Sequence, residues 1–80
     1  MPALRKRSLL LAGHGTSLAL EPEFWAVLEA AAARQGLSLA ALVARIDAGR
    51  GERALASACR VFALQFASNS DHPREGGDPS

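Results

Sequence analysis

The 80-residue sequence has a single cysteine, Cys59, so no disulfide can form within the chain. No set of cysteine and histidine residues has the spacing of a metal site. A chain this short rarely buries enough apolar surface unless a disulfide, a metal or a partner subunit adds stability. We therefore expect a homodimer and no cofactor. The single thiol is typical of a reducing compartment.

Long apolar runs are also missing. Basic residues precede the leucines at 9–11, as in a secretory signal, but the apolar stretch stops at Gly13. A signal needs roughly 7 to 15 apolar residues, and crossing a bilayer needs roughly 18. We expect a cytoplasmic protein with no membrane partner.

The sequence lacks the arrangement of a catalytic nucleophile as well. Ser17 is outside any G-x-S-x-G motif, and no acidic partner for His14 can be identified. So small a chain also offers little concave surface for a substrate. We expect no enzyme activity and no small-molecule substrate, with His14 as a hydrogen-bonding residue at the entrance of a strand.

Charge is unevenly distributed along the chain. No acidic residue precedes Glu21, and residues 1–68 hold eight basic and five acidic side chains, a net charge of +3. Residues 69–80 have a net charge of −2 and almost no apolar side chain, which predicts a disordered tail. Residues 1–7 are predicted to form a flexible basic arm, and residues 8–68 a single domain. A modest positive charge is compatible with nucleic acid without requiring it.

A short alternating run, 16–20, turns directly into a helix. Its apolar positions predict a strand with Thr16, Leu18 and Leu20 on one face. The chain offers no convincing partner strand after it, so we expect it to pair with a second copy, with Leu9 to Leu11 as a possible extension of the ribbon.

Three helices are predicted after the strand. Pro22 suits a first helical position, and Gly36 suits a left-handed helix end, which predicts a helix over 22–35. Ser38 is a suitable N-cap for a second helix, which Gly49 ends. The third helix, over 52–67, is apolar almost all round and is expected to pack between subunits.

Several side chains are predicted to hold these elements together. Phe24 and Trp25 are interpreted as core residues in preference to base-stacking ones, and Cys59 as a small buried residue. Arg60 is expected to pair with an acid such as Asp47.

This order of elements resembles the ribbon-helix-helix family of dimeric DNA-binding regulators, and in particular its short bacterial members. The motifs that carry the likeness are Arg7-Ser8, Gly13-His14-Gly15-Thr16-Ser17, Leu20-Glu21-Pro22-Glu23-Phe24-Trp25 and Arg60-Val61-Phe62. The likeness covers about residues 7–66. The predicted fold class is therefore mainly α, a ribbon-helix-helix fold with one short N-terminal strand paired across an intertwined homodimer and three helices.

The resemblance implies that a two-stranded ribbon enters the DNA major groove. The strand residues facing away from the core, Gly15, Ser17 and Ala19, would then contact bases, and the start of the second helix at Ser38 would hold a phosphate. Arg5, Lys6 and Arg7 would add phosphate contacts.

Glycine and alanine make no bidentate hydrogen bond, so Ser17 is the only polar base contact expected from that strand. The sequence therefore predicts a dimeric transcriptional regulator. The alternative is a dimeric protein-interaction module of the same fold with little or no sequence-specific DNA binding.

Overall fold

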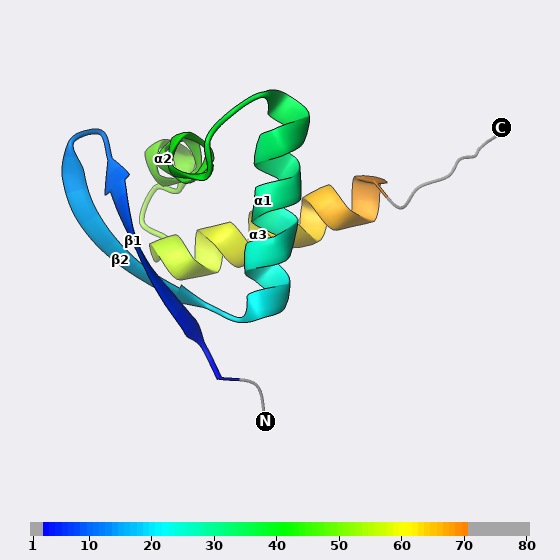
Figure 1. Cartoon of the computed structure of the whole chain (residues 1–80), viewed down its shortest axis with the longest axis horizontal. Helices are drawn as coiled ribbons and strands as arrows, with labels where there is room; N and C mark the ends of the chain where they lie inside the picture. The colour runs from blue at the N-terminus through cyan, green and yellow to red at the C-terminus, as the bar shows by residue number, and fades with distance from the viewer. Residues whose placement is uncertain (1–2, 71–80) are drawn as a thin grey trace, which may run out of the picture.

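The computed structural model describes residues 3–70, in which a two-stranded sheet is followed by three helices (Figure 1). The strands are β1 (Arg5–Leu11) and β2 (His14–Leu20). The helices are α1 (Pro22–Gln35), α2 (Leu39–Gly49) and α3 (Leu55–Ser70). The predicted class, mainly helical with a short N-terminal ribbon, is confirmed at this level, with two strands in place of one.

The two strands form an antiparallel hairpin within one chain, with Arg5 opposite Leu20 and Leu11 opposite His14. Ala12 and Gly13 connect them, both at positive φ (52° and 85°). Positive φ at both residues of a two-residue connection matches the right-handed twist of paired strands. The expectation that residues 16–20 find their pairing partner in a second copy is therefore wrong, because β1 supplies those backbone hydrogen bonds.

The predicted flexible basic arm is also corrected in part. Arg5, Lys6 and Arg7 belong to β1 and take part in the ladder, opposite Leu20, Ala19 and Leu18. Most of the predicted tail, residues 71–80, lies outside the described residues. Asn69 and Ser70, which were assigned to that tail, belong to α3.

The predicted bounds of α1 are confirmed. Gly36 ends the helix in the left-handed region at φ 70°, and the amides of Gly36 and Leu37 donate to the carbonyls of Ala33 and Ala32. These two hydrogen bonds satisfy carbonyls that a helix end leaves unpaired. After this turn, the hydroxyl of Ser38 accepts a hydrogen bond from the Ala41 amide at 3.0 Å, as expected of an N-cap.

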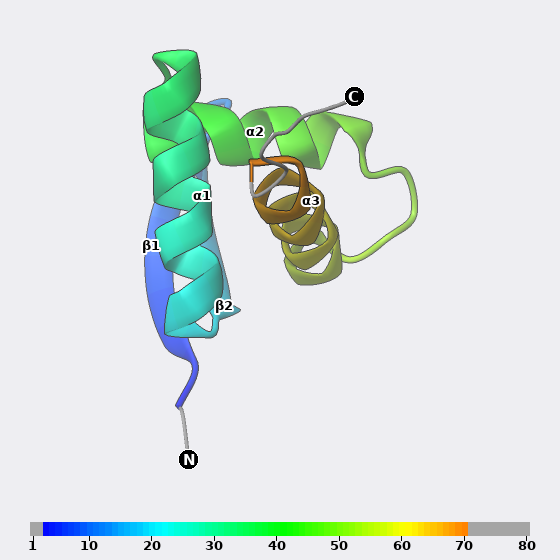
Figure 2. The same ribbon diagram turned by 90° about the vertical axis from the view of Figure 1, so that its right-hand side faces the viewer.

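The core lies between the inner face of the hairpin and the three helices. Its largest fully buried side chains include Leu20 from β2 and Leu28 from α1, and α2 contributes Leu42 and Val43. Cys59 of α3 is fully buried in the same cluster, as predicted. Figure 2 shows α3 running beneath α2, so this nearly apolar helix finds much of its cover within the chain.

Arg60 pairs with an acid other than the one predicted. Its Nε donates to Glu21 Oε1 at 2.9 Å, which joins α3 to the junction of β2 and α1. Asp47 instead pairs with Arg50, three residues further along the chain. The pair of Asp47 and Arg50 forms between neighbouring residues of the chain. The pair of Arg60 and Glu21 depends on how α3 packs against the start of α1, which the sequence pattern does not specify.

Within residues 3–70, no single helix is long and apolar enough to cross a membrane. The helices α1 and α2 reach that length and composition only as a pair bent by 99°.

Candidate nucleic-acid interface

One face of the hairpin points away from the helices. The ladder sets Lys6 opposite Ala19, Ser8 opposite Ser17 and Leu10 opposite Gly15. Because side chains alternate along a strand, these pairs share one face. We call it the outer hairpin face, and its members are Lys6, Ser8, Leu10, Gly15, Ser17 and Ala19. All of them except the half-buried Ala19 are exposed.

The outer hairpin face combines polar and apolar groups. Lys6 carries an ammonium group, and Ser8 and Ser17 carry hydroxyls that both donate and accept hydrogen bonds. Leu10 is 67% exposed and adds an apolar side chain to this face. The face can therefore form hydrogen bonds and one ionic contact at its Lys6 end and an apolar contact at its turn end.

Gly15, Ser17 and Ala19 share one strand face, as their alternation predicts, and the register brings Lys6 and Ser8 beside them. Ser8 was missed. The signal for it was the β1 register, which follows once residues 5–11 are taken as a strand that pairs with β2. With that register, the polar side chains on the outer hairpin face of each chain increase from one serine to two serines and a lysine.

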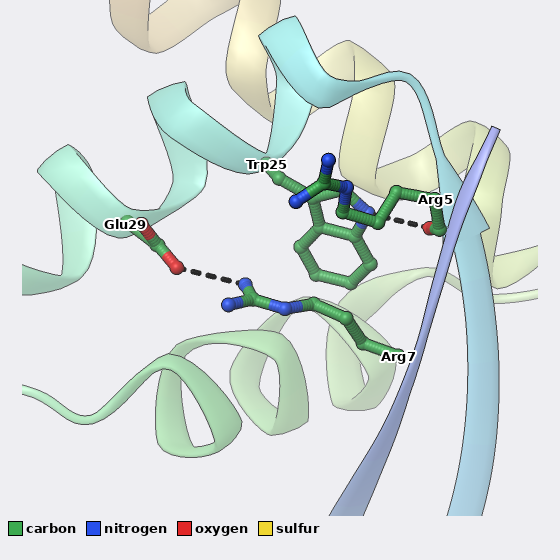
Figure 3. Close-up of polar contacts among 4 residues, drawn as sticks. All are labelled: Arg5, Arg7, Trp25 and Glu29. Atoms are coloured by element: carbon green, nitrogen blue, oxygen red, sulfur yellow. Dashed lines mark hydrogen bonds and ion pairs between the residues drawn. The ribbon is translucent and has the colours of Figure 1, made fainter. Parts of the chain in front are cut away.

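The other two predicted basic residues lie on the opposite side of β1, toward α1 (Figure 3). Arg7 Nη1 contacts Glu29 Oε2 at 2.8 Å, and the Arg7 guanidinium lies 5.0 Å from the centre of the Trp25 ring. The indole Nε1 of Trp25 donates to the Arg5 carbonyl at 2.8 Å. Arg7 of β1 therefore contacts two residues of α1 and stabilises the packing of β1 against that helix.

A small cleft of about 170 Å³ lies at this junction, lined by Arg5, Arg7, Pro22, Trp25, Ala26 and Glu29. Both guanidinium groups border it, but Glu29 already supplies the carboxylate that Arg7 contacts. An anion entering from solvent has to compete with that carboxylate for Arg7. Arg5 is exposed and has no such contact among the described residues.

Ser38 occupies the start of α2. Its hydroxyl oxygen is engaged by the Ala41 amide, so its role within the chain is to cap the helix. The first amides of a helix have no acceptor within that helix, which leaves those of Leu39 and Ala40 pointing outward from the N-terminus. A phosphate at this position would bind to backbone amides in preference to the serine hydroxyl.

His14 begins β2 opposite Leu11, at the predicted strand entrance, and is exposed. Among residues 3–70 its side chain makes no hydrogen bond, so the structure does not show the hydrogen-bonding role predicted for it. Within residues 3–70, no three His, Cys, Asp or Glu side chains lie close enough to hold a metal ion. Burial, with the nearby Asp47 charge, raises the pKa of the Cys59 thiol to about 11, which is the opposite of what a reactive thiolate needs.

Comparisons with known proteins agree with this architecture. A sequence model of the ribbon-helix-helix domain matches residues 4–67. A solved structure, an uncharacterized protein from Bordetella pertussis Tohama I, superposes with a TM-score of 0.72 at 36% sequence identity. The match covers 91% of the present chain and 65% of that protein's chain. No curated protein matches the chain.

Proposed function

Because the chain belongs to the ribbon-helix-helix family, we propose that it is a DNA-binding protein that acts as a homodimer and places its hairpin in the major groove. Members of this family generally form dimers and bind DNA. The observation that supports the proposal is the outer hairpin face, where Lys6, Ser8 and Ser17 stand on two adjacent strands. The major groove admits a two-stranded β-ribbon, and side chains on its exposed face can reach the base edges.

The composition of this face determines what kind of DNA binding we propose. Lys6 can bind a phosphate or the acceptor atoms of guanine, and serine hydroxyls can bond to several bases. No Arg, Asn or Gln is present on the face to make a bidentate contact, each of which would add roughly 1 to 3 kcal/mol of discrimination. We therefore propose moderate sequence preference with a substantial phosphate contribution from Lys6, Arg5 and the amides at the start of α2.

The hairpin's remaining edges support the proposed homodimer. A two-stranded sheet leaves one backbone edge of each strand without a partner in the described part of the chain. We propose that two hairpins pair edge to edge, which doubles the outer hairpin face and its lysines. In this arrangement the protein would serve as a cytoplasmic transcriptional regulator.

Binding of a labelled random duplex pool, measured at several salt concentrations with sedimentation at matched protein concentration, tests this proposal. Affinity should fall with salt by about 0.9 in log–log slope for each phosphate neutralised. Lys6→Ala should reduce that slope by about one for each lysine that contacts a phosphate. Arg53→Ala, which removes an exposed charge from the connection between α2 and α3, serves as the matched control and should leave the slope unchanged.

A second function is favoured by the turn end of the same face. Leu10 and Gly15 lie opposite each other there and offer an apolar surface, with Leu10 67% exposed. Such a surface suits contact with another protein. A stable dimer that binds no duplex at low salt, and whose Lys6→Ala variant behaves as the parent, would identify the chain as a protein-interaction module.

A further inference from the structure

A second surface, unrelated to the hairpin, lies between the end of α2 and the middle of α3. It is an open groove of about 330 Å³ lined by Arg45, Ile46, Gly49, Arg50, Arg53, Ala58, Val61, Phe62 and Gln65. Its floor is apolar, formed by Ile46, Val61 and Phe62, which are only half-buried in the chain. Its rim carries three arginines, and no acidic side chain lines it.

The rim arginines differ in what they contact. Arg50 is held in place by Asp47 and donates from Nη1 to the Arg53 carbonyl at 2.6 Å. Arg45 and Arg53 are exposed, and among residues 3–70 neither forms an ion pair. Two guanidinium groups are therefore available at the border of an apolar floor.

The groove is remote from the outer hairpin face. In Figure 2 the C-terminal end of α2 and the connection to α3 extend to the side of the molecule away from β1 and β2. A ribbon inserted in DNA would leave this side exposed. The arginines of the groove are thus placed for a ligand other than the DNA that the hairpin is proposed to bind.

From these observations we propose that the groove docks an acidic amphipathic segment of another protein. Apolar side chains of that segment would cover Ile46, Val61 and Phe62, and its carboxylates would pair with Arg45 and Arg53. Guanidinium groups are well suited to bidentate binding of carboxylates. Helix-in-groove docking of an amphipathic segment is a recurring form of peptide recognition.

Segments of this chain are poorly suited to cover the groove. Residues 71–80 are acidic but contain no Leu, Ile, Val or Phe to cover the floor. A second copy is little better, because ion pairs hold Glu21, Glu29 and Asp47, and only Glu23 and Glu52 remain among the acids of residues 3–70. The supply of apolar and acidic side chains therefore favours a separate partner.

Titration of the ¹⁵N-labelled full chain with a synthetic peptide tests the proposal. The probe is a helix-forming peptide of about 15 residues with leucines along one face and glutamates elsewhere. A control peptide carries glutamine at every glutamate. The expected result is amide shifts centred on Ala58, Val61 and Gln65, with much weaker binding of the control peptide.

Variants locate the contact. Arg45→Ala and Arg53→Ala should each weaken binding of the glutamate peptide about two- to fivefold, the range for rim-exposed ion pairs. Lys6→Ala removes one positive charge from the hairpin, far from the groove, and should leave binding of the glutamate peptide unchanged. Both arginines are exposed, so these variants should fold as the parent does.

Four results from the peptide titration and the variants would overturn the proposal. They are no peptide binding at millimolar concentration, equal binding of the glutamine peptide, equal weakening by Lys6→Ala, or loss of the dimer in the arginine variants. The last would assign the groove to a second copy. Duplex binding that depends on Arg45 and Arg53 would assign it to DNA instead and would contradict the proposal just as clearly. The DNA-binding proposal is tested separately, by the effect of Lys6→Ala on duplex binding. Peptide docking in the groove and DNA binding by the hairpin can therefore each be refuted without the other.

Discussion

Trp25 is the residue that joins the hairpin to the helices. Its ring is 3% exposed, its Nε1 donates to the Arg5 carbonyl, and the Arg7 guanidinium covers one face of the ring. The sequence predicts a core residue at this position. The hydrogen bond and the arginine contact could not be predicted, since both depend on β1, whose strand character was hidden by three consecutive basic residues.

The Trp25→Phe variant should lower the free energy of unfolding by about 1 to 2 kcal/mol, because the partly buried Arg5 carbonyl loses its donor. Urea unfolding followed by circular dichroism measures this. Glu29→Gln, which removes the exposed partner of Arg7, is the matched control and should cost under about 1 kcal/mol. A larger loss for Glu29→Gln than for Trp25→Phe would contradict this assignment of the stabilising contact.

The buried thiol of Cys59 gives a second prediction at this scale. Its pKa is raised from 9.0 to about 11 in the folded chain, mainly by burial. The folded state therefore keeps the thiol proton while the unfolded state releases it above about pH 9. This contribution to stability is fully present below pH 9 and should be lost as the pH rises toward 11.

Unfolding free energies measured from pH 8 to 11 test the sign, with Cys59→Ala as the comparison. The parent should lose more stability than Cys59→Ala over that interval. Alkylation of the native thiol by iodoacetamide should also remain slow at pH 9. Fast alkylation there, in a chain that remains folded, would show that Cys59 is accessible and not buried as described.

Among the elements, α1 was the most predictable and β1 the least. Pro22 and Gly36 fix the ends of α1 by local backbone geometry alone, so the sequence was sufficient. In β1, Arg7 faces the core side, where its side chain lies over Trp25 while its charge pairs at the surface. An arginine in an inward position breaks the apolar alternation that identifies a strand, and the register with β2 was needed to recover it.

Gly36 gives the prediction for this scale. Gly36→Ala should cost about 1 to 2 kcal/mol, because a Cβ is disfavoured at its φ of 70° although the space around it is open. Gly49→Ala, at the end of α2, also has open space but no positive φ. This control should be neutral or stabilise by up to about 1 kcal/mol. Thermal unfolding of both variants shows whether the loss of stability comes from the backbone conformation or from the room available for the added Cβ.

At the scale of the whole molecule, the intrachain hairpin changes the physical reason for a dimer. A single predicted strand would need a second copy to complete a sheet, whereas β1 and β2 complete a two-stranded sheet in one chain. The set of residues assigned to the candidate interface changes as well. Ser17 was predicted from the alternation in β2, while Ser8 and the position of Lys6 on the same face depend on long-range strand pairing that local patterns do not encode.

The contact between Glu21 and Arg60 holds distant parts of the chain together. The pKa of Glu21 is lowered from 4.5 by a hydrogen bond from its own backbone amide, then by the hydrogen bond and charge of Arg60. A lowered carboxyl pKa contributes stability that is present above pH 4.5 and is lost as the pH falls below it.

The Glu21→Gln variant should therefore be less stable than the parent at pH 7, and the difference should shrink as the pH falls below 4.5. Acid titration monitored by the fluorescence of Trp25 measures this convergence. Glu23→Gln changes an exposed acid in the first turn of the same helix, without an ion pair among the described residues, and serves as the control. Identical pH profiles for the two variants would contradict the role assigned to Glu21.

The proposed role of the outer hairpin face is tested most directly by mapping amide shifts of the ¹⁵N-labelled chain as a duplex selected from a random pool is added. The largest shifts should fall on Lys6, Ser8 and Ser17 and at the start of α2, with two chains bound per duplex and little change at Arg45 or Arg53. Shifts confined to α2 and α3 with an unchanged hairpin, or saturation at one chain per duplex, would contradict a ribbon that enters the groove as a dimer.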